Sequence, residues 1–333
     1  MSGRRSVALF AGVLAAAILV GFAGLLVGAK PMPLRTALTA VFGTVKGVDG
    51  IIVWTLRMSR SVAAFLGGTG LAVSGHILQT LTRNPLAAPG LTGVTAGAVA
   101  AIVTCFTFLP ALSSAFYPLI GLAGGLAAAS MTFWIARGGS ASPLHLALGG
   151  IAVSLFLGAV TTYILLFGAP QSPAILFWLS GGFQGRSWAQ ILLLLPWVTA
   201  GLLGVLTCHR ILSLLTLGDA AANAMGLDAT RWRRLLLLLA VCPVAGIASV
   251  AGPIAFVGLV VPHVVRLLRP TQEAWALALN AVVGGLLLVV ADVIARSIAA
   301  PREIPVGIVT ALIGGPFFIA LVQRRRPLAG AGA

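Results

Sequence analysis

The sequence predicts an all-α polytopic membrane protein of about ten transmembrane helices, organised as a single domain over residues 1–333. The first observation is composition, since 59% of the residues are hydrophobic and the mean hydropathy is +1.08. The second is that only 8% are charged, whereas soluble proteins carry about 25% charged residues on their wetted surfaces. The third is a recurrence of apolar stretches close to the ~20 residues that a helix needs to cross a bilayer.

Charged residues, Pro and Gly separate the apolar stretches and mark the expected ends of the helices. The ten segments are residues 6–28, 60–81, 91–109, 115–136, 144–168, 189–209, 233–251, 255–268, 276–299 and 306–322. No charge interrupts the first one from Ser6 to Ala29, so we expect a retained helix and not a cleaved signal, whose apolar core is shorter. Segment 255–268 is short enough to be tilted or to span only part of the membrane. The longest polar stretches, near 30–56, 169–188 and 210–232, are expected to be loops.

Glycine spacing predicts closely packed helices. The chain has 41 glycines, with GxxxG spacing at Gly93/Gly97 and Gly121/Gly125 and a cluster from Gly67 to Gly70. Small residues let helix backbones approach closely inside a membrane. We therefore expect a compact bundle.

The charge balance indicates membrane topology. Twenty-one Lys and Arg residues outnumber six acidic ones, but they lie at the ends of apolar runs, without the basic stripe typical of nucleic-acid binding. Ten crossings with Arg4 and Arg5 inside also place the arginines at 324–326 inside. We expect a multi-pass protein of the cytoplasmic (inner) membrane, with both termini cytoplasmic and no nucleic-acid partner.

The sequence offers no energy source of its own. It contains no GxxxxGK[ST] phosphate-binding loop. The intramembrane acid Asp292 has Arg296 four residues on, where the two can neutralise each other, so a proton relay is disfavoured. A self-sufficient secondary carrier would need unpaired intramembrane acids, and a membrane-embedded enzyme would need a cluster of acids, His or Cys at membrane depth. We predict no catalytic residue, no metal site and no cofactor bound by this chain.

Four stretches carry a family resemblance. They are RMSRSVAAFLGGTGLAVSGHILQTLTRNPLAAPGLTGVTAGA from Arg57, LGDAAANAMGLD from Leu217, AGPIAFVGLVVPHVVRLL from Ala251 and ADVIARSIAAPREIPVGIVTALIGGPFF from Ala291. In order and spacing they resemble the FecCD-type permeases of ATP-binding-cassette (ABC) importers, which carry iron–siderophore complexes, haem or cobalamin. The resemblance covers essentially the whole chain. It implies a type II ABC importer permease fold and transport by alternating access.

The resemblance also implies partners and a cargo. The partners are a cytoplasmic ABC ATPase dimer that hydrolyses ATP with Mg²⁺, a periplasmic or lipoprotein substrate-binding protein, and a second permease copy in a homodimer. The stretches RNPLA…GVTAGA and FWLSGGFQGRSW favour a ferric siderophore as cargo. Haem and cobalamin stay open as alternatives.

The loop 211–228 resembles the segment through which importer permeases receive force from the ATPase. The residues expected to couple are Leu217, Gly218, Asp219, Ala220, Ala221 and Gly226. Gly226 suits a helix C-terminal cap. Asp219 stands where many family members have Glu, and either acid favours a helix N-terminus.

Three arginines match family positions that dock acidic residues of the binding protein: Arg57, Arg60 and Arg296. A guanidinium binds a carboxylate through two parallel hydrogen bonds, which suits this role. The alternative is anchoring of helices at the membrane interface, and Asp292 is a competing partner for Arg296. Family members often have Pro between the first two arginines, whereas this chain has Met58 and Ser59.

The resemblance implies that the fifth and tenth helices line the translocation path, so Ser154, Gly158, Thr161 and Thr162 are expected in its wall. Asn84 and Pro85 are expected on the path as irregular backbone that lines a cavity, and the alternative is that they only connect two helices. Asn84-Pro85 predicts a turn, after which Pro85 and Pro89 are expected to start the next helix. His76 and Gln79 share one helix face and are expected to serve as a polar gate or in packing. His76 as an axial haem ligand is the alternative, although a single His in a Gly-rich helix more often makes interhelical hydrogen bonds.

Overall fold

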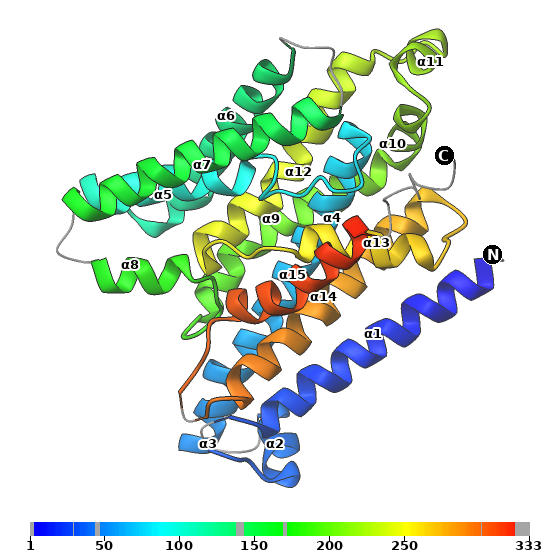
Figure 1. Cartoon of the computed structure of the whole chain (residues 1–333). Helices are drawn as coiled ribbons and strands as arrows, with labels where there is room; N and C mark the ends of the chain where they lie inside the picture. Colours follow the sequence, from blue (N-terminus) through cyan, green and yellow to red (C-terminus); the bar gives the residue numbers. More distant parts are fainter. Residues whose placement is uncertain are drawn as a thin grey trace, which may run out of the picture.

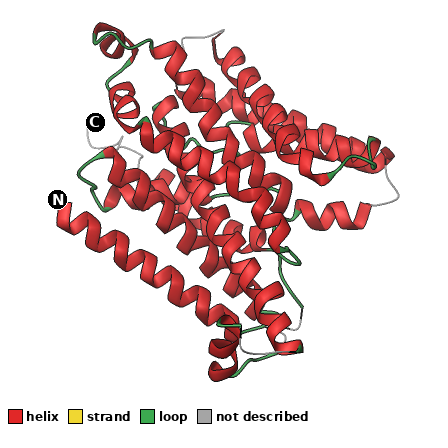
Figure 2. Ribbon diagram, turned by 180° about the vertical axis from the view of Figure 1, so that it is seen from behind, coloured by secondary structure: helices red, strands yellow, loops and turns green. Residues whose placement is uncertain are grey.

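The computed structural model describes residues 3–28, 30–43, 47–137, 143–168, 172–300 and 302–323. These residues form helices joined by loops, without a β-strand among them (Figure 2). All ten predicted segments correspond to helices. They are α1 (Gly3–Leu26), α4 (Ser59–Thr82), α5 (Val94–Phe108), α6 (Tyr117–Arg137), α7 (Pro143–Gly168), α9 (Trp188–Thr207), α12 (Ala229–Ala251), α13 (Val257–Leu267), α14 (Glu273–Ser297) and α15 (Val306–Gln323).

Length and composition agree with a membrane protein. Seven helical stretches of the described residues are long and apolar enough to cross a bilayer, and three shorter apolar helices complete the set, in α5, α13 and α15. The predicted all-α polytopic membrane fold is confirmed.

The expected loops contain short helices that their polarity concealed. They are α2 (Leu34–Val41), α3 (Val48–Ile51), the π-helix η1 (Ile52–Met58), α8 (Ser172–Leu179), α10 (His209–Thr216) and α11 (Asp219–Ala224), and outside these loops the 3₁₀ turn η2 (Ser114–Phe116) precedes α6. In α2, Ala37 and Ala40 are buried whereas Leu34 and Leu38 are exposed. Such a short amphipathic helix depends on its tertiary contacts, because an isolated helix of this length is unstable in water.

Two ends of the bundle can be defined from Figure 1. The short helices α2 and α3 lie together at one end, here called the α2 end, and α10 and α11 lie at the opposite one, here called the α11 end. Helix α1 starts away from α2 and α3 and runs towards them.

Helix α4 begins earlier than the predicted residue 60. The helical stretch is continuous over 35 residues, Val48–Thr82, through α3, η1 and α4. Met58 and Ser59 allow this because neither breaks the backbone hydrogen bonds that a proline would remove. The Ser59 hydroxyl donates to the Thr55 carbonyl at 2.6 Å within this junction.

Glycine–glycine contacts hold α4 at the centre of the bundle, as the glycine spacing predicted. A Cβ on Gly68 would lie 2.0 Å from the Gly284 carbonyl oxygen of α14, and one on Gly75 would lie 1.9 Å from that of Gly258 in α13. Between α5 and α6, a Cβ on Gly97 would lie 2.3 Å from the Gly124 oxygen. These backbones touch directly, which is how helices gain van der Waals contact inside a membrane.

The chain between α4 and α5 corrects one expectation. Residues 83–93 are non-helical, and α5 begins only at Val94, after Gly93 with φ +81°. Pro85 and Pro89 therefore do not start a helix. The Asn84 side chain accepts a hydrogen bond from the Leu86 N–H at 2.9 Å, which forms the predicted turn.

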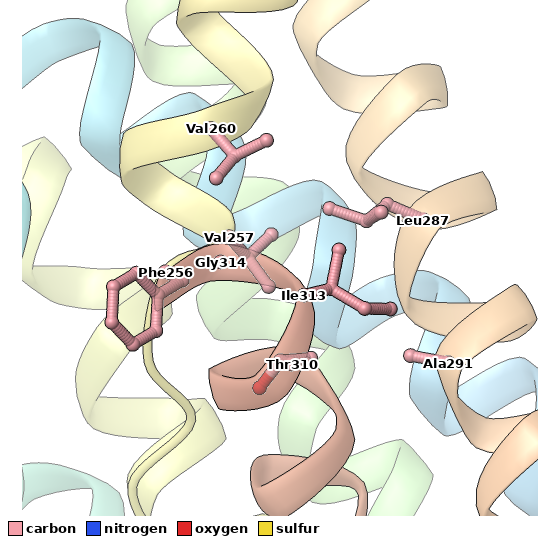
Figure 3. Close-up of a pocket in the computed structure, with 8 residues that line it drawn as sticks. All are labelled: Phe256, Val257, Val260, Leu287, Ala291, Thr310, Ile313 and Gly314. Carbon is pink, nitrogen blue, oxygen red and sulfur yellow. The ribbon is translucent and has the colours of Figure 1, made fainter. Parts of the chain in front are cut away.

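A second irregular segment separates α12 from α13, and α13 is a half-length helix of 11 residues, as the short segment 255–268 suggested. Phe256 adopts φ +68° there, a left-handed conformation that is uncommon for a bulky side chain. A Cβ added to Gly314 would lie only 2.3 Å from the Cβ of Phe256, so Phe256 fills the space beside this glycine. Figure 3 shows Phe256 and Gly314 at one edge of a narrow apolar crevice between α13, α14 and α15.

Candidate functional site

The three predicted docking arginines converge at the α2 end, and all three are buried. Their exposed fractions are 7% for Arg57, 3% for Arg60 and 3% for Arg296. Arg57 lies in η1 and donates hydrogen bonds to the carbonyls of Leu25, in the last turn of α1, and of Lys30, just beyond it. It thus satisfies carbonyl groups left free where α1 ends.

Asp292 of α14 is the fully buried carboxylate that holds the other two arginines. Its Oδ1 accepts from Arg60 Nε at 2.7 Å, and its Oδ2 accepts from Arg296 Nη2. The predicted pairing of Asp292 with Arg296 is confirmed. Arg60 also donates from Nη1 to Glu303 Oε2 at 2.6 Å. In this conformation Arg60 and Arg296 bind acidic side chains of the same chain, and Arg57 binds carbonyls at the end of α1. None of the three guanidinium groups faces solvent.

The coupling segment occupies the α11 end. Asp219 is the first residue of α11 and follows Gly218, whose φ is +112°. Its Oδ1 accepts from Arg83 Nη2 at 2.7 Å and from Arg233 Nη2 at 2.6 Å. Arg233 donates also to the Leu81 carbonyl at 2.5 Å. Asp219 therefore ties α11 to the end of α4 and to α12.

The C-terminus of α11 has the predicted glycine cap. Gly226 has φ +80°, its N–H donates to the Asn223 carbonyl at 2.9 Å, and the Leu227 N–H donates to the Ala222 carbonyl at 3.0 Å. This pair of bonds is the Schellman motif. Two large apolar side chains beside α11 are exposed, Leu217 at 65% and Met225 at 52%. Ala220 is exposed and Ala221 half-buried on the same short helix.

The predicted path residues divide between two environments. On α7, Gly158 and Thr162 are exposed, whereas Thr161 is 6% exposed and donates to the Leu157 carbonyl within the helix. Ser154 donates to the Gly90 carbonyl at 3.0 Å and so joins α7 to the 83–93 segment. Thr161 thus lies on the packed side of the helix.

An open crevice adjoins the 83–93 segment at the α11 end of α4. Its cavity volume is about 260 Å³, and it is lined by that segment, α7 and α15. Asn84 and Thr92 are among its polar lining residues, and Leu146 and Phe318 face it from α7 and α15. Of the predicted path residues, Asn84 lines it, while the predicted positions on α7 lie outside it.

His76 belongs to a polar cluster between α4, α13 and α14. Its Nε2 lies 2.5 Å from Glu273 Oε1, and its Nδ1 lies 3.3 Å from Asn280 Nδ2, which also donates to the Ala276 carbonyl. Both ring nitrogens are thus engaged, so the interhelical hydrogen-bonding role fits and an axial haem ligand does not.

Gln79, one turn further along α4, extends this contact to α13. Its Nε2 donates to the Gly258 carbonyl at 3.3 Å, and Arg266 Nη1 donates to its Oε1 at 2.5 Å. This polar cluster therefore links three helices.

Sequence reasoning missed the partners of these residues. Glu303 and Glu273 lie 243 and 197 residues from the groups that they contact, and Arg83 and Arg233 were not singled out beside Asp219. The sequence held a signal for these pairs, because it has only six acidic residues and buried charged side chains are nearly always paired. Each acidic residue was therefore a candidate partner for a buried basic one.

Comparison with known proteins identifies the family. The family model of the FecCD transport family matches residues 15–324. The chain belongs to the FecCD transport family. This FecCD-family protein is a multi-pass membrane permease, a transport component of an ABC importer.

Curated relatives and a solved structure agree with this assignment. The FecCD-family permease is 38% identical over 304 residues to the Fe(3+)-citrate import system permease protein YfmD of Bacillus subtilis, covering 91% of this chain and 90% of the relative. It is 38% identical over 302 residues to the cobalamin import system permease protein BtuC of Halobacterium salinarum, covering 90% and 81%. A metal-chelate type ABC transporter solved in an inward-facing conformation superposes with a TM-score of 0.80 at 27% identity, covering 96% of this chain and 99% of that one. The predicted type II importer permease fold and permease function are confirmed.

Proposed function

We propose that this permease imports a ferric siderophore across the cytoplasmic membrane, as one half of a homodimeric pore powered by a separate ATPase dimer. In this proposal the α11 end faces the cytoplasm and the α2 end faces outward, so both termini are cytoplasmic. The chain binds no cofactor of its own, and the partner hydrolyses ATP with Mg²⁺.

The observation that carries the proposal is the construction of α11. A short helix with small side chains, exposed Leu217 and Met225 on its flanks and a glycine cap can seat in a groove of a partner. Asp219 connects this helix to α4 and α12 through Arg83 and Arg233. Force applied to α11 would therefore reach the central helix of the bundle directly.

We place the second copy of the homodimer against an apolar face on α7 and α15. Leu155 and Leu166 on α7 are 70% and 74% exposed, and Leu312 and Ile319 on α15 are 70% and 58% exposed. The same two helices line the crevice beside Asn84. A second copy packed against this face would enclose a path between the two chains, with Gly158 and Thr162 near its wall.

Docking of a periplasmic or lipoprotein substrate-binding protein is assigned to the α2 end. Arg57, Arg60 and Arg296 place three positive charges there against the two negative charges of Asp292 and Glu303. The excess of positive charge suits acidic residues on the partner.

The cargo assignment follows the relative that transports Fe(3+)-citrate, together with the sequence stretches around Asn84 and Trp188. Identity alone does not separate the cargoes, since the cobalamin permease is equally identical at 38%. The test is uptake of a radioiron-labelled siderophore into proteoliposomes holding the permease, its ATPase and its binding protein. We expect uptake that requires ATP, persists with an uncoupler, and is not competed by haem or cobalamin. Uptake without the ATPase, or uptake abolished by an uncoupler alone, would instead identify a secondary carrier.

A further inference from the structure

The guanidinium of Arg60 is only partly satisfied. Nε donates to Asp292 at 2.7 Å and Nη1 donates to Glu303 at 2.6 Å. The third nitrogen, Nη2, is buried and has no hydrogen-bond partner in the described part of the chain. A buried donor without a partner is costly, so this edge of Arg60 favours a further acceptor.

The two carboxylates that bind Arg60 differ in how easily their ion pair with it can break. Asp292 lies on α14, has no exposed side-chain surface and also holds Arg296. Glu303 lies in the linker between α14 and α15, and 45% of its side chain is exposed. An ion pair with one partner in solvent is weak and exchanges easily, whereas breaking a fully buried pair is strongly unfavourable.

The contact of Glu303 with Arg60 is also geometrically incomplete. A carboxylate binds a guanidinium best through two parallel hydrogen bonds. Nη1 and Nη2 form one edge suited to such a pair, yet Glu303 accepts only from Nη1. A carboxylate that bound both nitrogens would satisfy the free donor and would outcompete Glu303.

We propose that Glu303 is an internal stand-in for a carboxylate of the docking partner, which displaces Glu303 and binds Arg60 through Nη1 and Nη2. This inference rests on the proposed docking at the α2 end and adds the residue that governs access to it. In this proposal, Arg60 is buried as long as the binding protein is not docked.

Displacement of Glu303 also reaches the start of α15. The next residue, Ile304, donates from its N–H to the Ala295 carbonyl at 3.2 Å and accepts from Gln184 Nε2 at 2.9 Å. Release of Glu303 removes one of the contacts that hold this linker, while the two bonds of Ile304 and its packing against the core remain. Docking would thereby loosen the entry to α15.

The experiment measures access to Arg60 in the full-length permease in lipid nanodiscs. Phenylglyoxal modifies arginine, and mass spectrometry of the Arg60 peptide gives the labelling rate for wild type, Glu303→Gln and Glu303→Ala. We expect faster labelling in both variants. A decaglutamate peptide should protect Arg60 at a concentration about tenfold lower than in wild type, as expected for loss of one charge-assisted competitor.

The matched control is Asp49→Asn. Asp49 is an exposed carboxylate at the same end that pairs with Lys30 at 2.7 Å and does not contact Arg60. The labelling rate of Arg60 in this variant should therefore match that in wild type. Equal Arg60 labelling in the Glu303 variants and in Asp49→Asn would overturn the proposal, and so would faster labelling without protection by the peptide. This assay needs no transport, so a failed siderophore uptake assay would count against the proposed function alone.

Discussion

Asp219 at the start of α11 accepts a 2.6 Å hydrogen bond from Arg233 on α12. The contact joins the exposed coupling helix to the bundle, and Arg83 at the end of α4 shares the same oxygen. Since Asp219 is 53% exposed, the contact contributes little to stability and matters for the position of α11.

Asp219→Asn should therefore uncouple transport without unfolding the protein. We expect ATP-driven siderophore uptake to fall about tenfold, equivalent to about 1.4 kcal/mol. The free energy of unfolding should change by less than about 1 kcal/mol. Uptake assays and thermal unfolding in detergent measure the two effects. Wild-type uptake in the variant would remove Asp219 from the coupling path.

Gly226→Val should damage the cap of α11. A Cβ at Gly226 would meet no atom within 4 Å, so space is available, but φ +80° disfavours any β-branched residue. We expect a local cost of about 1–2 kcal/mol and strongly reduced uptake. Gly226→Asn is the control, because Asn tolerates this conformation, and it should retain most of the uptake. Equal activity of the two variants would contradict the role of the cap.

Gly75→Ala should destabilise the whole bundle. Its Cβ would lie 1.9 Å from the Gly258 carbonyl oxygen, and two packed backbones must separate to admit it. We expect a loss of about 3 kcal/mol, the upper range for overpacking. Gly158→Ala is the matched control, since no atom lies within 4 Å of that position on α7, and it should be neutral or stabilising. Thermal unfolding and the monodisperse fraction on gel filtration compare them.

Asp292→Ala should be the most destabilising change at the α2 end. It leaves Arg60 and Arg296 buried without their shared carboxylate, at an expected cost of about 3–5 kcal/mol. Removing Asp49 from its exposed pair with Lys30 should cost less than about 1 kcal/mol. Similar unfolding temperatures for both variants would show that the buried network is not what holds α4 to α14.

His76 should not ligate haem. Because Glu273 and Asn280 engage both ring nitrogens, we expect added haem to give the same Soret absorption with wild type and His76→Ala. A Soret band that depends on His76 would return haem to the candidate cargoes.

The helices were predictable because lipid demands long apolar segments, a strong local signal. The early start of α4 was not, since residues 48–58 are mixed in polarity and their π-helix depends on packing against α1. The proline rule also failed at Pro85 and Pro89, where the 83–93 segment is held by tertiary contacts such as Ser154 with the Gly90 carbonyl.

The candidate site was predictable where a motif is local and obscure where it depends on distant pairing. The glycine cap at Gly226 and the pair of Asp292 with Arg296 lie within a few residues and were both foreseen. Glu303 and Glu273 meet their partners across 197 or more residues, which no local spacing encodes. Arg57 likewise meets the carbonyls of Leu25 and Lys30 across 32 and 27 residues, so its burial was equally hidden.

The π-helix η1 is a segment at one end of the central helix that could also adopt an α-helical conformation. Its hydrogen bonds run from i to i+5, whereas α4 uses i to i+4, and no proline between Arg57 and Arg60 prevents conversion of one into the other. Rewinding the seven residues Ile52–Met58 as α-helix would turn Arg57 about the axis of α4 and separate it from the carbonyls of Leu25 and Lys30. Such a rotation would release the hydrogen bonds of Arg57 to the end of α1 and leave the glycine contacts deeper in the bundle in place.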